Sequence, residues 1–234
     1  CIRDRLNRKA QESEKMKQAF INSICHEIRT PLNSIVGFSD LIMNEDIDEE
    51  MRREFPAEIQ KSTLLLTRLV NSMLEVANLD VSEDKLPCEP VDIRNMCMQE
   101  MEKISPKPRI KYQLDITEDT LFIPTNAQYL TMVIEHLLNN ANKFTEEGFI
   151  ALGYKVNLSK NQICISVTDS GCGIPKEKQE EVFNRFSKLD TFVPGNGLGL
   201  YLCRLIVKRL DGEIKIDPEY TDGTRVVVNL PMNE

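Results

Sequence analysis

His26 is one of only two histidines in the chain, and its place in the surrounding apolar pattern is unusual. Apolar residues recur every three or four positions through this region, at Phe20, Ile24, Ile28, Leu32, Ile35, Phe38 and Ile42. This spacing predicts a helix with one buried face. A residue two positions beyond Ile24 is rotated by about 200° from that face. We therefore expect the imidazole of His26, a potential nucleophile or base, to face solvent or a partner.

A second segment that could do chemistry runs from Glu135 to Thr145. On a helix, Asn140 and Lys143 would share a face that is separate from the apolar face of Val133 and Leu137. An amide oxygen can bind Mg²⁺ that already holds phosphates, and a lysine supplies a compact positive charge. The alternative interpretation is an ordinary amphipathic helix with a polar end.

The first of two glycine-rich segments is Asp169-Ser170-Gly171-Cys172-Gly173-Ile174-Pro175. It follows a strand pattern and precedes a helix that a proline would start well. Glycines let the backbone approach a ligand, and a carboxylate at the end of a strand can accept a hydrogen bond from an exocyclic amine. A plain strand-to-helix turn is the alternative.

The second glycine-rich segment is Gly195-Asn196-Gly197-Leu198-Gly199-Leu200, and it opens a predicted helix whose first amides favour an anion. It is not a dinucleotide-binding fingerprint, because no βαβ unit with a ribose-binding acid surrounds it. It also lacks the Gly-Lys-Ser/Thr of a P-loop. The preceding loop, residues 187–194, could act as a lid.

The first half of the chain must supply a long helical scaffold for His26. Helical character runs to about Glu45, which is roughly 60 Å at 1.5 Å per residue and too long for one small globule. An acidic turn over residues 44–50 leads to a second apolar stripe: Met51, Phe55, Ile59, Leu66, Leu69, Met73 and Val76. Two such helices form a hairpin, and we expect two copies to close a four-helix bundle, which predicts a homodimer.

The second half mixes helix and strand patterns beyond a charged, proline-containing linker over residues 81–90. We expect helices over 93–104, 127–141, 176–186 and 199–210, and strands over 110–116, 121–123, 149–158, 162–168, 213–216 and 224–230. Helices beside one mainly antiparallel sheet give an α+β sandwich. The chain is thus predicted to be multidomain, with an all-α unit over 1–80 and an α+β unit over 91–234.

Composition narrows the possible partners and the compartment. A formal net charge of −8 argues against a nucleic-acid surface, which needs clustered Lys and Arg. Seven scattered cysteines favour reduced thiols over a disulfide framework. The sequence has no run of 18 apolar residues, so this segment is expected to be cytoplasmic and without membrane contact, with or without an anchor elsewhere in a longer protein.

Each of the four segments is a weak signal, but their order along the chain is specific. With the histidine segment first, then the asparagine segment, then the two glycine-rich segments, the chain closely resembles a sensor histidine kinase of bacterial two-component systems. Residues 1–80 resemble that family's dimerisation and phosphoacceptor hairpin. Residues 91–234 resemble its catalytic ATP-binding domain, of the type shared with gyrase and heat-shock chaperones. Val182-Phe183-Asn184-Arg185-Phe186 is similar to the family's phenylalanine block.

For the hairpin, the resemblance implies that His26 attacks the γ-phosphorus of ATP. Glu27 would orient the ring and accept the proton from its other nitrogen. Thr30, one helical turn on, resembles the position that aligns a water for dephosphorylating a partner. Pro31 cannot donate to the carbonyl of Glu27, so we expect a bend beside the phosphoacceptor.

For the second domain, the resemblance implies a Mg·ATP site. Asn140 would be the Mg²⁺ ligand, Lys143 a phosphate contact, and Asp169 the carboxylate that reads adenine. Arg185 would stabilise the transferring phosphoryl group, with a surface salt bridge as the alternative. The glycine segments would supply the turn beneath the base and the phosphate-binding end of the lid, through Gly171, Gly173, Gly195, Gly197, Leu198 and Gly199.

His136 departs from the family pattern. It lies one helical turn before Asn140, where the family usually has a second asparagine and related ATPases carry a water-activating glutamate. A metal contact and a packing or hydrogen-bonding role are both open for this residue. Glu135 is rotated by about 100° from it and is not an obvious substitute.

The leading hypothesis is an ATP-dependent protein-histidine kinase that phosphorylates His26. It would relay the phosphoryl group to an aspartate on the receiver domain of a response regulator, with phosphatase activity as a further option. One alternative is an ATPase of the same fold that acts as a conformational clamp, which the absence of glutamate at position 136 disfavours. Another is a non-catalytic signalling scaffold.

Overall fold

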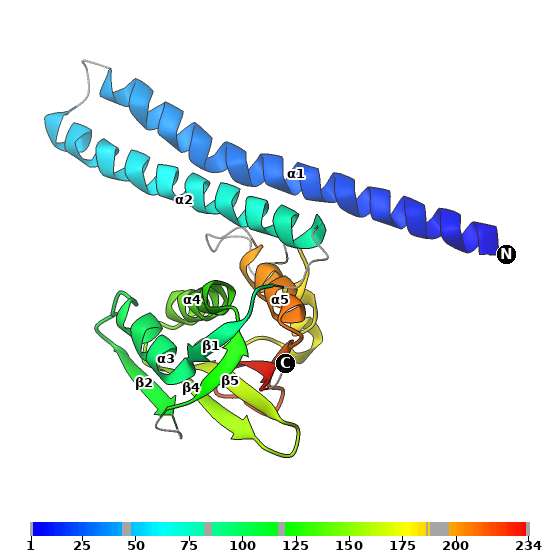
Figure 1. The fold of residues 1–234 in the computed structure, drawn as a ribbon. Coiled ribbons are helices and arrows are strands. Elements are labelled where there is room, and N and C mark those ends of the chain that lie inside the picture. The colour runs from blue at the N-terminus through cyan, green and yellow to red at the C-terminus, as the bar shows by residue number, and fades with distance from the viewer. Residues whose placement is uncertain are drawn as a thin grey trace. The chain divides into compact units, whose positions relative to one another are not determined.

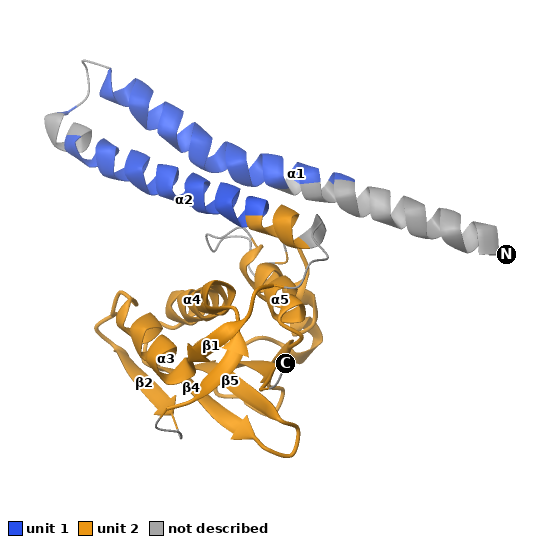
Figure 2. Cartoon of the chain, in the orientation of Figure 1, with its two compact units in different colours: residues 1–74 blue, residues 75–234 orange. Residues whose placement is uncertain are grey.

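The protein is described by a computed structural model covering residues 2–43, 48–81, 86–116, 120–185, 187 and 197–232. It divides into two compact units, residues 1–74 and residues 75–234 (Figure 2). The division falls inside a helix, and Val76 and Leu79 from the end of that helix are buried in the core of the second unit. The predicted domain boundary at residue 80 stays a prediction.

The first unit is a helical hairpin (Figure 1). Helix α1 spans Ile2–Ile42 and α2 spans Glu49–Val81. The rings of Phe38 and Phe55, one from each helix, have centroids 5.5 Å apart. The two long helices are confirmed, although α1 ends three residues before the predicted end and residues 49 and 50 already belong to α2. Residues 44–47 of the predicted acidic turn lie outside the described residues.

One hairpin buries little of its apolar surface. Among the described side chains between residues 18 and 74, only Phe55, Ser62 and Leu69 are buried. The large apolar side chains that stay exposed are Ile21, Leu32, Val36, Leu41, Met43, Leu64, Leu65, Val70 and Leu74. A soluble monomer rarely leaves so much apolar surface in contact with water.

The second unit is built on a five-stranded sheet with the order β2-β4-β5-β7-β6. The strands are β2 (Ile110–Ile116), β4 (Gly148–Asn157), β5 (Gln162–Asp169), β6 (Glu213–Ile216) and β7 (Thr224–Pro231). Only β2 and β4 are parallel, and the other neighbours are antiparallel. Helices α3 (Ile93–Glu102), α4 (Ala127–Phe144) and α5 (Gly199–Arg209) cover one face (Figure 1). The predicted α+β sandwich is confirmed.

Local sequence accounts for the two elements that matter most for the site. In β5 every second residue, Ile163, Ile165 and Val167, is buried beneath the helices, which places the alternate residues on the opposite face. Helix α4 begins where the side chain of Asn126 accepts a hydrogen bond of 3.1 Å from the amide of Tyr129. Its buried stripe is Leu130, Val133, Ile134, Leu137, Leu138 and Ala141.

Two expectations for the second unit are wrong. Residues 89 and 90, placed in the linker, begin β1 (Glu89–Asp92), which pairs antiparallel with β3 (Phe122–Thr125) in a separate two-stranded sheet. In the segment predicted as a helix over 176–186, the described residues 176–185 contain two 3₁₀ turns instead, η1 (Lys176–Lys178) and η2 (Glu181–Phe183). Among these described residues only the adjacent pair Val182 and Phe183 is buried, which gives no apolar stripe for an α-helix.

The remaining structural expectations concern thiols and membranes. The six described cysteines are all free thiols. No helix among the described residues is both long enough and apolar enough to cross a bilayer.

Candidate active site

The histidine segment lies on α1, within the first unit. The side chain of His26 is exposed, as predicted, while Ile24 and Ile28 are partly buried. The hydroxyl of Thr30, also exposed, donates a hydrogen bond of 3.3 Å to the backbone carbonyl of His26. The helix continues through Pro31, and Thr30 lies one turn beyond His26. The bend expected at Pro31 stays a prediction.

The asparagine segment forms the last turns of α4. Asn140 is half-buried and Lys143 is exposed, with its ammonium 4.6 Å from the centroid of the Phe144 ring. The side-chain amide of Asn140 makes no hydrogen bond to another described residue. In Asn142, two residues on, both the oxygen and the nitrogen of the side-chain amide are hydrogen-bonded, to Tyr112 and Ser105. The amide oxygen of Asn140 is therefore available to a ligand.

Asp169 ends β5 and lies at the centre of a hydrogen-bonded turn. One carboxylate oxygen, Oδ1, accepts bonds from the amides of Gly171 (2.9 Å) and Thr224 (3.3 Å). The side chain is 7% exposed, and this burial raises the pKa of Asp169, while the two amide bonds act in the opposite direction. Its other oxygen, Oδ2, accepts no hydrogen bond from a described residue and can accept one from a ligand amine.

The first glycine segment is pressed against α4 and against the turn before β7. A Cβ atom added to Gly171 would lie 2.5 Å from the carbonyl oxygen of Phe144, and Gly173 has a φ of 71°. A Cβ at Gly173 would come within 3.1 Å of the carbonyl oxygen of Gly223. Side chains are excluded from both positions, so the end of α4 and this segment form one surface.

Gly223 and Thr224 were not among the predicted site residues. The sequence does mark a turn here, because the Asp222-Gly223 pair precedes a strand rich in β-branched residues. That pair predicts where the chain turns, but not that the turn meets Asp169, which is 55 residues away.

The second glycine segment opens α5. Gly197 has a φ of 62°, Leu198 is fully buried, and Gly199 is the first helical residue. Leu198 at the N-cap provides no side-chain acceptor for the first-turn amides, which leaves them suited to an anion. Gly195 lies outside the described residues.

His136 of α4 lies beside this helix start. Its Nδ1 is 3.5 Å from the place where a Cβ on Gly199 would be. Burial lowers the pKa of His136, and the nearby carboxylate of Glu135 opposes the effect, so the ring is neutral near pH 7. Helix α4 thus contacts both glycine segments, through His136 at one and Phe144 at the other.

Arg185 follows η2. Its guanidinium lies 4.8 Å from the centroid of the Tyr201 ring on α5. Its neighbour Asn184 accepts a hydrogen bond of 3.2 Å from Arg204 of the same helix. Arg185 is therefore held at the α5 side of the unit.

The comparisons with known proteins separate the possible classes. Residues 125–234 match the family model of histidine kinase-, DNA gyrase B- and HSP90-like ATPases, which spans several activities. Residues 16–81 match the His Kinase A (phospho-acceptor) domain, and the two together are decisive. The chain belongs to the two-component sensor histidine kinases.

Relatives of this histidine kinase chain support the same assignment. It is 29% identical, over 95% of its length, to hybrid signal transduction histidine kinase A of Dictyostelium discoideum. The crystal structure of full-length ShkA in complex with AMPPNP matches 93% of the chain, with a TM-score of 0.69 and 26% identity, over 46% of the ShkA chain. Histidine kinase ThkA in complex with response regulator protein TrrA matches 97%, with a TM-score of 0.72 and 25% identity, over 65% of that chain.

The chain spans 11% of the length of the Dictyostelium relative and 36% of a sensor-like histidine kinase of Pyropia yezoensis, to which it is 30% identical over 91% of its own length.

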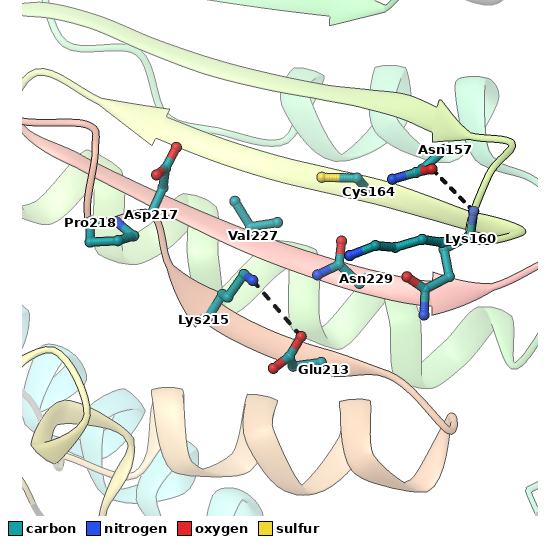
Figure 3. Close-up of a pocket in the computed structure, with 10 residues that line it drawn as sticks. Asn157, Lys160, Cys164, Glu213, Lys215, Asp217, Pro218, Val227 and Asn229 are labelled. Carbon is teal, nitrogen blue, oxygen red and sulfur yellow. Dashed lines mark hydrogen bonds and ion pairs between the residues drawn. The ribbon is translucent and has the colours of Figure 1, made fainter.

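A hollow of about 340 Å³ lies elsewhere in the kinase chain, on the sheet face opposite the helices (Figure 3). Its lining includes Cys164 of β5 and Asn229 of β7, which are partly exposed and alternate with buried neighbours in their strands. None of the residues predicted to bind nucleotide lines this hollow.

Proposed function

We propose that the chain transfers the γ-phosphoryl group of ATP to His26 and then passes it to an aspartate on the receiver domain of a response regulator. The observation that carries the proposal is the pairing of an exposed histidine on a phosphoacceptor hairpin with an ATP-binding fold whose buried Asp169 keeps Oδ2 open.

The chemistry follows from the side chains present. A ring nitrogen of His26 forms a bond to the γ-phosphorus, and the bond from phosphorus to the bridging oxygen breaks, which releases ADP. The proton on the other ring nitrogen passes to Glu27. In the second step an aspartate oxygen of the receiver attacks the same phosphorus, and the phosphorus–nitrogen bond breaks. Thr30, one helical turn from His26, would align a water molecule for dephosphorylation of the receiver.

In the second unit, Asp169 would accept a hydrogen bond from the exocyclic amine of adenine. The first-turn amides of α5 and Lys143 would contact the phosphates, with the backbone of Gly171, Gly173, Gly195, Gly197, Leu198 and Gly199 lining the nucleotide. Arg185 would leave the ring of Tyr201 to meet the transferring phosphoryl group.

The residues present fit a magnesium ion that arrives with the nucleotide. No group of three His, Cys, Asp or Glu side chains in the described part of the chain could hold a metal by itself, so phosphate oxygens must supply ligands. The uncommitted amide oxygen of Asn140 is the protein ligand we propose. Bound Mg²⁺ would neutralise charge on the phosphates.

The exposed apolar side chains of the hairpin support a homodimer closed as a four-helix bundle. We expect light scattering from the full chain at micromolar concentration to give twice the mass of one chain. A monomer mass under those conditions would rule out this assembly.

The deciding experiment is incubation of the full chain with γ-labelled ATP and Mg²⁺. We expect label on the protein that is lost in acid and stable in alkali, as a phosphoramidate is. Free phosphate without labelled protein would instead support the ATPase alternative. Neither product, with nucleotide still bound, would support the scaffold alternative.

Replacing Asn140 with alanine tests the metal role. We expect label to be lost and the gain in ATP affinity on adding Mg²⁺ to shrink by about tenfold, because a metal ligand is gone. The control is Asn139→Ala, an exposed neighbour on the same helix. An unchanged Mg²⁺ dependence in Asn140→Ala would contradict the assignment. The same titration on His136→Ala, which leaves no side-chain ligand, decides between a metal contact and a packing role for His136.

A further inference from the structure

The C-terminal end of α4 is held by a loop that precedes β2. The side chain of Lys107, half-buried, donates hydrogen bonds to two backbone carbonyls at that helix end, those of Asn142 and Thr145 (2.9 Å to the latter). The last carbonyls of a helix have no partner within the helix, and they carry the negative end of its dipole. A lysine ammonium is therefore well matched to this position.

The same loop is tied back to α4 through side chains. The hydroxyl of Tyr112 donates to Oδ1 of Asn142 (2.8 Å) and accepts from the amide of Lys107 (3.1 Å). The side-chain nitrogen of Asn142, Nδ2, donates a hydrogen bond to the backbone carbonyl of Ser105 (3.2 Å). We call these five residues, Ser105, Lys107, Tyr112, Asn142 and Thr145, the α4 clasp.

The clasp encloses the turn that carries the nucleotide-site residues. Asn142 lies between Asn140 and Lys143, and Phe144 follows at once. The carbonyl oxygen of Phe144 would be 2.5 Å from a Cβ on Gly171, so the helix end and the first glycine segment are in close contact. A shift of this turn would move Asn140 and Lys143 relative to Asp169.

We propose that Lys107 is a positioning residue of the nucleotide site. It holds the last turn of α4 so that Asn140, Lys143 and the first glycine segment keep the spacing that ATP requires. The inference rests on the proposed function. The ammonium of Lys107 is committed to backbone carbonyls, so it acts through α4 rather than on the phosphates.

The test is Lys107→Met in the full chain, which keeps an unbranched side chain only one atom shorter and removes the charge. We expect the affinity for a fluorescent ATP analogue to fall about five- to tenfold, within the range of one charged hydrogen bond. The KM for ATP in autophosphorylation should rise by a similar factor. The kcat should stay within about twofold, because bound nucleotide restores the spacing. Lys107→Arg should recover most of the affinity.

Tyr112→Phe removes the hydroxyl that bonds Asn142 and Lys107, and it tests the α4 clasp even if Lys107→Met does not fold. We expect it to weaken nucleotide binding about threefold, and the double variant to be less affected than the two single effects multiplied, because both residues act on one helix end. Lys111→Met, an exposed neighbour on β2, is the matched control and should bind normally.

The outcomes separate this inference from the proposed function. Normal affinity and KM in a folded Lys107→Met chain would overturn the positioning role, and so would fully additive effects in the double variant. Failure of the unmodified chain to bind ATP would instead overturn the proposed function. Thermal unfolding of each variant without nucleotide shows whether the affinity loss exceeds any loss of folded protein.

Discussion

We expect the His26→Gln chain, incubated with γ-labelled ATP and Mg²⁺, to carry no acid-labile label. A glutamine amide nitrogen is not nucleophilic, so the phosphorus–nitrogen bond cannot form. The loss should reach background, at least about a thousandfold, the scale on which removal of a nucleophile slows covalent catalysis. Because His26 is exposed and lies in the first unit, nucleotide affinity should be unchanged.

The small number of histidines makes the result of this experiment easy to interpret. The chain has two histidines, so any phosphohistidine that survives in His26→Gln could only lie on His136. That ring is partly buried on α4. Cys25→Ser, which changes an exposed neighbour on α1, is the matched control and should be labelled normally. Acid-labile label that persists in His26→Gln and disappears in His136→Asn would refute the central assignment.

The elements with a regular apolar period were predictable from sequence. The strand over 110–116 and the strand over 213–216 were predicted with the bounds that the structure shows. Helix α4 was predicted one turn too short, because the predicted pattern stopped at Ala141, its last buried residue, while the polar last turn continues to Phe144. That last turn carries Lys143, so the weakest part of the pattern coincides with the site.

The contacts that assemble the site were not predictable from local pattern. Asp169 was recognised by its place at the end of a strand, but its hydrogen bond to Thr224 spans 55 residues. Lys107 gave no signal at all, because its partners on α4 are 35 and 38 residues away. Side-chain bonds to backbone groups leave no period in the sequence, so only the folded structure shows them.

The second large effect is expected from Asp169→Asn, which should nearly abolish ATP binding without unfolding the chain. Asparagine keeps an oxygen that can accept from the amides of Gly171 and Thr224. Its NH₂ group replaces the second oxygen and cannot accept a hydrogen bond from the adenine amine. Two donors would then face each other in a buried site, at a cost of about 2–4 kcal/mol, or about 30- to 1,000-fold in affinity.

The same substitution should leave stability unchanged or raised, with a defined pH dependence. Burial raises the pKa of Asp169 above its ordinary value of 3.8, so the folded chain holds this proton more tightly than the unfolded chain. The stability that comes from the protonated form is complete below the ordinary pKa and is lost as the pH rises through the raised value. Asp169→Asn removes that step, so its advantage over the unmodified chain should appear as the pH rises above about 4.

Urea unfolding without nucleotide, at pH values on both sides of this step, measures the stability difference, and fluorescence titration measures ATP affinity. Asp217→Asn is the control, since Asp217 bonds the guanidinium of Arg225 and is not part of the nucleotide-site residues. A variant that both unfolds and loses ATP would show that Asp169 is needed mainly for the fold. Normal ATP affinity in a folded Asp169→Asn chain would exclude it as the adenine-reading group. Loss of binding with undiminished stability is the result expected of a buried carboxylate kept for a ligand, because burial of its ionised form costs stability that the amides of Gly171 and Thr224 offset only in part.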